Sequence, residues 1–186
     1  MYYFIGVSEH YPNYAWVTYT KNSNLELYNF LCNEVISEPI IYPVFETGKR
    51  INIERFVKYD LVMSDLVPLF SARFKDLISE KAPGDVQFIK SFIYHKSELI
   101  GTYFIPVFLK VIDCINWKES IYDEQIGEFK KIMIADNALG DNKIVKAKDF
   151  QFGLPIIQEG IYRECKKMNI QGCEFYPNPY INPLFN

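Results

Sequence analysis

The densest group of side chains that could do chemistry is a set of four carboxylates in the acidic segment 113–128: Glu119, Asp123, Glu124 and Glu128. Paired carboxylates can exchange protons with a substrate or hold a hard metal ion. Glu119 and Asp123 would share one face of a helix, because they are four residues apart. The segment contains no histidine that could complete a site. A solvated acidic loop is therefore the simpler interpretation, and neither a metal nor a cofactor is predicted.

The charge of this segment suggests a different use. It holds five acidic residues, including Asp113, against the single lysine Lys118, which gives a local net charge of −4. An acidic surface can dock into the basic cleft of a protein that acts on nucleic acid, and electrostatic steering speeds the encounter. The four carboxylates are thus candidate partner-binding residues, with an ordinary solvated loop as the alternative.

The other residues capable of catalysis are two histidines and four cysteines. His95, or the pair Asp123 and Glu124, could belong to a small hydrolase-like site, whereas His10 lies in a turn-rich stretch. The cysteines show neither a C-x-x-C pair nor zinc-site spacing, so they are expected to be free, buried thiols in a reducing compartment. The sequence contains no nucleophile elbow, phosphate loop, dinucleotide fingerprint or zinc-protease motif. These observations favour a protein that is not an enzyme.

Composition predicts one α+β domain over residues 1–186. The chain is 49% hydrophobic and 17% aromatic, and its net charge of −3 does not suit a nucleic-acid-binding protein. No apolar run approaches the roughly 20 residues that cross a bilayer, and residues 1–7 lack a basic leader. We therefore expect a cytoplasmic protein without a membrane partner. Its oligomeric state cannot be derived from the sequence.

The candidate residues must be positioned by many short strands and a few helices. Helical spacing after Ser71 predicts a helix that Pro83 ends, and a second helix is predicted over 156–168. The apolar run 102–112 predicts a central strand that breaks or bulges at Pro106. Two short runs before it, and a surface tail over 177–186, complete the prediction of a mixed or mostly antiparallel sheet.

A longer pattern extends over about residues 55–178. Ser71 opens a helix after a short apolar run, and a hydrophobic strand then leads to Asp113, with Ser120 following it. A late helix reaches a turn at Gly172 and a terminal strand. The segments that carry the pattern are Asp60–Ser64, Pro68–Ile78, Gly84–Phe88, Tyr103–Asp113, Trp117–Ser120, Pro155–Ile161 and Gly172–Pro177.

In the order and spacing of these segments, the chain resembles an immunity-protein family of bacterial polymorphic toxin systems, formerly described as a domain of unknown function. The resemblance implies a protein that binds and neutralises a cognate toxin domain without catalysis. It assigns no catalytic role to Ser71, Asp113, Ser120 or Gly172. Structural roles are expected instead: a helix cap for Ser71, a turn for Asp113 and Ser120, and a positive φ angle for Gly172. A small hydrolase-like enzyme remains the alternative.

Overall fold

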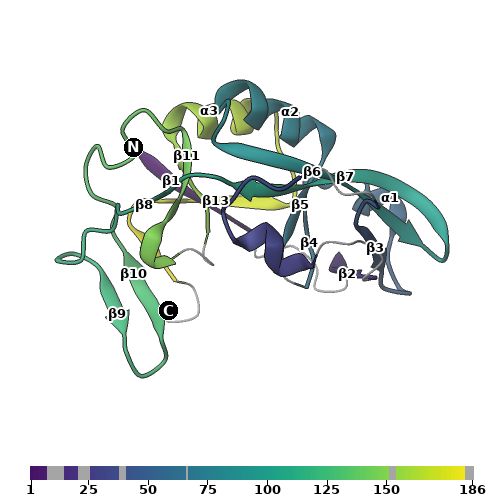
Figure 1. Ribbon diagram of the computed structural model, residues 1–186, viewed down its shortest axis with the longest axis horizontal. Coiled ribbons are helices and arrows are strands. Elements are labelled where there is room, and N and C mark those ends of the chain that lie inside the picture. The colour runs from purple at the N-terminus through teal and green to yellow at the C-terminus, as the bar shows by residue number, and fades with distance from the viewer. Residues whose placement is uncertain (8–14, 21–25, 38–40, 66, 151–153, 183–186) are drawn as a thin grey trace.

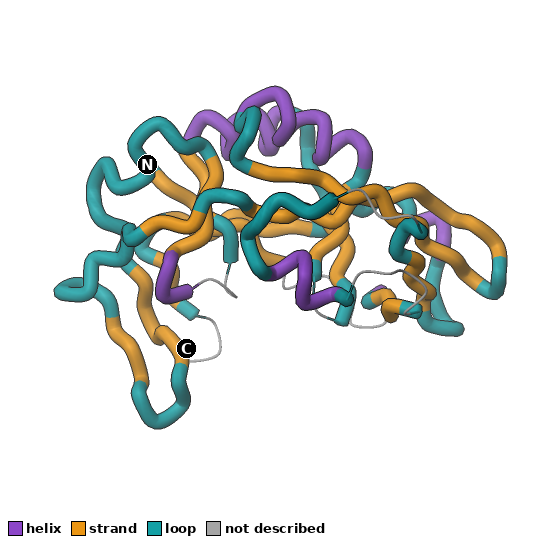
Figure 2. The backbone as a smooth tube through the Cα atoms, viewed as in Figure 1, coloured by secondary structure: helices purple, strands orange, loops and turns teal. Residues whose placement is uncertain are grey.

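The computed structural model describes residues 1–7, 15–20, 26–37, 41–65, 67–150 and 154–182. Within them the chain forms three sheets and three α-helices, so the predicted α+β class is confirmed. All strand pairs are antiparallel except β3 with β6 and β8 with β11, which agrees with the predicted mixed, mostly antiparallel pairing. Figures 1 and 2 show the arrangement.

The strands fall into sheets of six, five and three. The six-stranded sheet has the order β2 (Val17–Tyr19), β3 (Val44–Thr47), β6 (Val86–His95), β7 (Glu98–Phe108), β5 (Pro68–Phe70), β4 (Leu61–Met63). The five-stranded sheet has the order β13 (Cys173–Pro177), β1 (Tyr2–Val7), β12 (Ile156–Gln158), β11 (Ile144–Ala147), β8 (Val111–Ile112). The small sheet has the order β14 (Tyr180–Ile181), β10 (Glu128–Ile132), β9 (Ile121–Asp123).

The helices are short. The α-helices are α1 (Ile53–Phe56), α2 (Ala72–Lys81) and α3 (Glu159–Lys167), and 3₁₀ turns occur at η2 (Leu27–Leu31) and η3 (Lys148–Phe150). Helices α2 and α3 lie together along one side of the two large sheets (Figure 1). Their buried side chains form one core cluster with residues from both sheets. The small sheet packs through a separate cluster with the five-stranded sheet.

Helix α2 follows the sequence prediction. Ser71 is its N-cap and accepts a hydrogen bond from the backbone N–H of Phe74 at 3.2 Å. This bond satisfies one of the N–H groups that the first turn of a helix leaves unpaired. Phe74, Leu77 and Ile78 are buried, as their helical spacing predicted.

The second predicted helix begins three residues later than expected. Ile156, Ile157 and Gln158 form β12, which pairs with β1 on one side and β11 on the other. Both isoleucines are fully buried. Burial between two strands suits β-branched side chains, and this tertiary pairing outweighs the helical spacing of the apolar residues.

Pro106 does not interrupt its strand, so the predicted break was wrong. Strand β7 pairs continuously with β6 through Phe88 and Pro106, and the irregularity lies instead between Ile93 and Tyr94. Because β5 pairs with β7 only at Phe104, the proline nitrogen can face an unpaired side of the strand. The two runs predicted before this strand are a single strand, β6.

The described part of the tail is incorporated into the fold, which corrects the prediction of a surface tail over 177–186. Tyr180 is buried, and β14 extends the small sheet by pairing with β10. Asn178 exchanges hydrogen bonds with the backbone of Ile134, at 2.8 and 3.1 Å. Among the described residues, no helix is long and apolar enough to cross a membrane.

Candidate functional site

Strands β9 and β10 form a hairpin that extends away from the two large sheets (Figures 1 and 2). Asp123 shapes its turn, because its carboxylate accepts the backbone N–H groups of Gln125 and Ile126 at 3.0 and 3.2 Å. The backbone N–H of Gly127 donates to the carbonyl oxygen of Asp123 at 2.8 Å and closes the turn. The second half of the acidic segment 113–128 therefore forms the first strand and the turn of a hairpin.

The four predicted carboxylates lie in or beside this hairpin with different roles. Asp123 forms an ion pair with Lys130 at 2.7 Å, and the hydrogen bond from Lys130 lowers the pKa of this carboxyl. Its role is therefore to hold the hairpin. Glu119, Glu124 and Glu128 are exposed, although Glu119 also accepts a hydrogen bond from the Asn116 side chain at 2.9 Å. These three carboxylates can face a partner.

The hairpin also carries an aromatic group that sequence reasoning missed. Trp117 and Tyr122 are 50% and 44% exposed, and both lean on the buried ring of Phe129. The ring centroids of Trp117 and Tyr122 lie 5.3 and 4.9 Å from that of Phe129. Rings held in this way lose little conformational entropy on binding, which is the property of good interface anchors. The signal available in the sequence was the pair of aromatic residues among the acids.

Three exposed aliphatic side chains lie on the same small sheet or in its turn. Ile126 lies in the turn, Ile121 on β9 and Ile181 on β14, and all three are more than 40% exposed. Five of the eleven large hydrophobic residues exposed in the described part of the chain are in this small sheet or next to it. We call the set of exposed residues in or beside this hairpin the hairpin surface: Trp117, Ile121, Tyr122, Ile126 and Ile181, together with Glu119, Glu124 and Glu128.

The residues of the family pattern lie elsewhere or support this surface. The Ser120 hydroxyl donates to the carbonyl of Asn116 at 2.8 Å and accepts from the N–H of Met133 at 2.9 Å, so it fixes the chain that enters β9. Asp113 is exposed after β8, and its side chain makes no hydrogen bond within the described residues. Gly172 has the predicted positive φ, at 85°.

Ser71 leads to a buried carboxylate that the sequence did not single out, Asp60. The Ser71 hydroxyl donates to Asp60 Oδ1 at 2.7 Å, and the backbone N–H of Gln171 donates to Oδ2 at 2.8 Å. The Arg73 guanidinium forms an ion pair with the same carboxylate and also donates to the carbonyl of Met168 at 3.1 Å. Asp60 therefore joins the start of α2 to the end of α3, and this arrangement is structural.

The two alternative enzyme candidates, His95 and the pair Asp123 and Glu124, lie in different parts of the fold. His95 lies at the tip of the β6–β7 hairpin. Its ring nitrogen Nδ1 and the Thr47 hydroxyl share a hydrogen bond of 2.7 Å. That tip and the β9–β10 hairpin lie at opposite ends of the molecule (Figure 1). His10 lies outside the described residues. No group of three His, Cys, Asp or Glu side chains in the described ranges could hold a metal ion.

The four cysteines form no disulfide among the described residues, but they are not all buried as predicted. Cys32 is exposed after the short η2 turn. Burial raises the thiol pKa of Cys114 to about 11 and that of Cys165 to about 12. Burial also raises the pKa of Cys173. These three thiols stay protonated near neutral pH, which makes them poor nucleophiles.

The fold and the hairpin surface together define an α+β protein with a group of exposed apolar side chains in and beside a projecting hairpin. A scan against protein-family models finds no match for this chain. A search of curated proteins likewise finds no significant relative.

Proposed function

We propose that this protein binds another protein through the hairpin surface, and that the partner is a cognate bacterial toxin domain. In this proposal the protein neutralises the toxin in the cytoplasm by occupying its surface, without catalysing a reaction. The observation that carries the binding role is the exposed aromatic pair Trp117 and Tyr122, whose rings pack against Phe129 within a segment rich in exposed carboxylates. The toxin assignment rests on the family resemblance.

The chemistry of the hairpin surface favours a partner with a basic rim around an apolar depression. Apolar side chains near the centre of an interface supply most of the affinity, whereas charges at the rim increase the association rate. In this proposal the exposed carboxylates Glu119, Glu124 and Glu128 form such a rim. Toxins that cleave nucleic acid have basic clefts, and this makes them the toxin class that the surface fits best.

Replacing Trp117 with alanine is expected to weaken toxin binding by at least about 2 kcal/mol, or roughly thirtyfold in Kd, because an interface anchor would be lost. Calorimetry with purified protein and toxin domain measures the change. Trp16→Ala is the matched control, since Trp16 is 43% exposed but lies in the chain entering β2, outside the hairpin. Equal losses in the two variants, or none in Trp117→Ala, would contradict the assignment of this surface.

Reversing the three exposed charges, with Glu119, Glu124 and Glu128 all changed to lysine, should slow association about tenfold at low salt and flatten its salt dependence. Asp123 stays unchanged in this variant, because it holds the turn. A control with Glu34, Asp76 and Glu80 changed to lysine alters net charge equally on other exposed parts of the chain. Stopped-flow measurement over a salt series separates the two variants. Identical salt dependence in both would remove the electrostatic part of the proposal.

The immunity role itself is tested by co-expression. The toxin domain encoded beside this protein's gene should kill cells alone and be tolerated with the wild-type protein, but not with Trp117→Ala. Purified protein should inhibit toxin activity with a one-to-one end point. Failure of the wild-type protein to protect cells or to bind that domain would overturn the immunity role. Binding without protection would leave only a binding function.

A further inference from the structure

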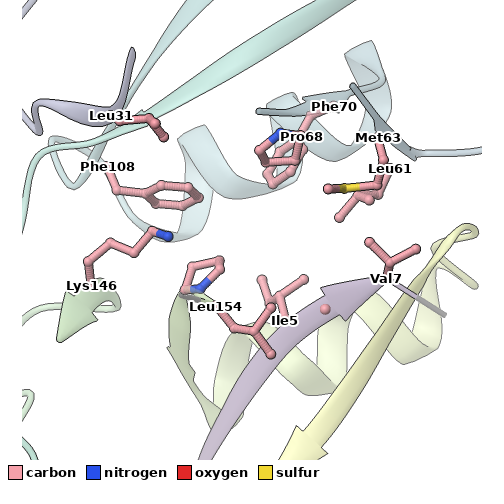
Figure 3. Close-up of a pocket in the computed structure, with 12 residues that line it drawn as sticks. Ile5, Val7, Leu31, Leu61, Met63, Pro68, Phe70, Phe108, Lys146 and Leu154 are labelled. Carbon is pink, nitrogen blue, oxygen red and sulfur yellow. The ribbon is translucent and has the colours of Figure 1, made fainter. Parts of the chain in front are cut away.

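A cavity of about 130 Å³ lies between the two large sheets (Figure 3). Strand β1 of the five-stranded sheet contributes Ile5 and Val7 to one wall. Strands β4 and β5 of the six-stranded sheet form the opposite wall, which includes Leu61 and Phe70. The cavity is separate from the hairpin surface, because the two share no residue.

The lining of this cavity is almost wholly apolar. Apart from Lys146, every described residue that lines it is glycine or has an apolar side chain. Phe70 and Phe108 contribute aromatic rings, and Met63 contributes a thioether sulfur. A polar group of a ligand would give up its hydrogen bonds to water and meet mostly hydrocarbon, which is unfavourable. The lining therefore favours a ligand without strongly polar groups.

Lys146 lies at one end of the cavity beside Phe108 (Figure 3). It is 7% exposed, and its ammonium nitrogen lies 5.4 Å from the centre of the Phe108 ring. The face of an aromatic ring attracts a cation at this distance. Because this contact lies within the protein, a ligand is not required to supply a charge.

We propose that this cavity binds one small, neutral aromatic molecule of about the size of a benzene ring. The volume sets the size, since an engineered apolar cavity of about 150 Å³ binds benzene. The walls set the aromatic class, because the rings of Phe70 and Phe108 and the sulfur of Met63 make favourable contacts with a further ring. Such a ligand would contact both large sheets. It should therefore raise the unfolding temperature, as any ligand does that binds only the folded state.

Four probes separate the size, the charge and the aromatic character of the ligand. Benzene, cyclohexane, naphthalene and benzoate should be titrated into the protein, with binding followed by calorimetry and NMR. Benzene is expected to saturate. Naphthalene, which is too large, and benzoate, whose carboxylate would have to leave water, should each bind at least about tenfold more weakly. Cyclohexane resembles benzene in size but has no π system, so it should bind about threefold more weakly.

The position of the ligand is tested separately from its affinity. Nuclear Overhauser contacts from bound benzene should reach the side chains of Ile5, Leu61 and Phe108. Val7→Phe adds bulk at the β1 wall and should weaken benzene binding at least about tenfold. The matched control is Val86→Phe, because Val86 packs against the same core cluster as Val7 but is not among the described lining residues. This control should bind benzene like the wild type, and thermal unfolding verifies that both variants fold.

Several outcomes would overturn this site, and none of them depends on toxin binding. The site is wrong if benzene does not saturate, if its nuclear Overhauser contacts lie outside the cavity, or if Val7→Phe binds benzene as tightly as Val86→Phe. Binding of naphthalene, benzoate or cyclohexane as tight as that of benzene would overturn the proposed size, neutrality or aromatic class of the ligand, respectively. If Val7→Phe does not fold, the nuclear Overhauser contacts in the wild-type protein decide the position.

Discussion

Replacing Asp60 with alanine is expected to reduce the free energy of unfolding by about 3 kcal/mol, because the change leaves buried hydrogen-bond donors without an acceptor. The carboxylate is 3% exposed and accepts from the Ser71 hydroxyl and from the backbone N–H of Gln171. Each donor that is left unpaired in a buried place costs about 1–3 kcal/mol. Arg73 contributes less to the loss, since its side chain is 46% exposed and water can solvate it.

Urea unfolding followed by tryptophan fluorescence measures this loss. Asp76→Ala is the matched control, because Asp76 is 69% exposed on α2 and its only ion pair within the described ranges is with the adjacent Lys75. Exposed ion pairs of this kind contribute less than about 1 kcal/mol. A loss below 1 kcal/mol in Asp60→Ala would show that the junction between α2 and α3 does not depend on this carboxylate.

The second large effect is expected at Gly172, where alanine should cost about 3 kcal/mol of stability. Two penalties combine at this position. The φ angle of 85° disfavours any side chain by about 1–2 kcal/mol. A Cβ atom would also overlap the carbonyl oxygen of Leu61, which is backbone at the start of β4 and cannot rotate away. The turn before β13 would therefore have to move.

Gly84→Ala separates these penalties. Gly84 has nearly the same φ angle, 82°, but a Cβ there would meet nothing within 4 Å. Its loss should therefore be limited to the conformational part, about 1–2 kcal/mol. The difference between the two alanine variants, measured by the same unfolding experiment, is the cost of the overlap. Equal losses would mean that the Gly172 turn relaxes freely.

Local patterns in the sequence predicted those features that depend on local physics. The cap at Ser71, the end of α2 before Pro83 and the positive φ of Gly172 each follow from the chemistry of one or two residues. The α+β class follows from many short aromatic and β-branched runs, which favour pleated sheets. The acidic segment was likewise visible as a candidate partner-binding region, and its role in binding stays a prediction.

Features that depend on distant partners were not predictable in the same way. Ile156 and Ile157 have helical spacing with later residues, but pairing with β1 and β11 makes them a strand. Tyr180 lies in a proline-rich tail and is nevertheless buried beside β10. In each case hydrogen bonds and burial supplied by residues far away in the sequence outweigh the local preference.

The sequence by itself determined that a group of carboxylates in segment 113–128 is a candidate partner-binding region, because their local charge can be read directly. The aromatic group and the turn that Asp123 and Gly127 form became apparent only in the structure. Only the tertiary structure decided which of these side chains are exposed to a partner. It pairs Asp123 with Lys130, leaves Glu124 and Glu128 exposed, and packs the ring of Trp117 against that of Phe129. It alone places Lys146 in an apolar cavity. The physical reason is that exposure and pairing depend on which distant surfaces meet, and side-chain spacing along the chain does not specify that.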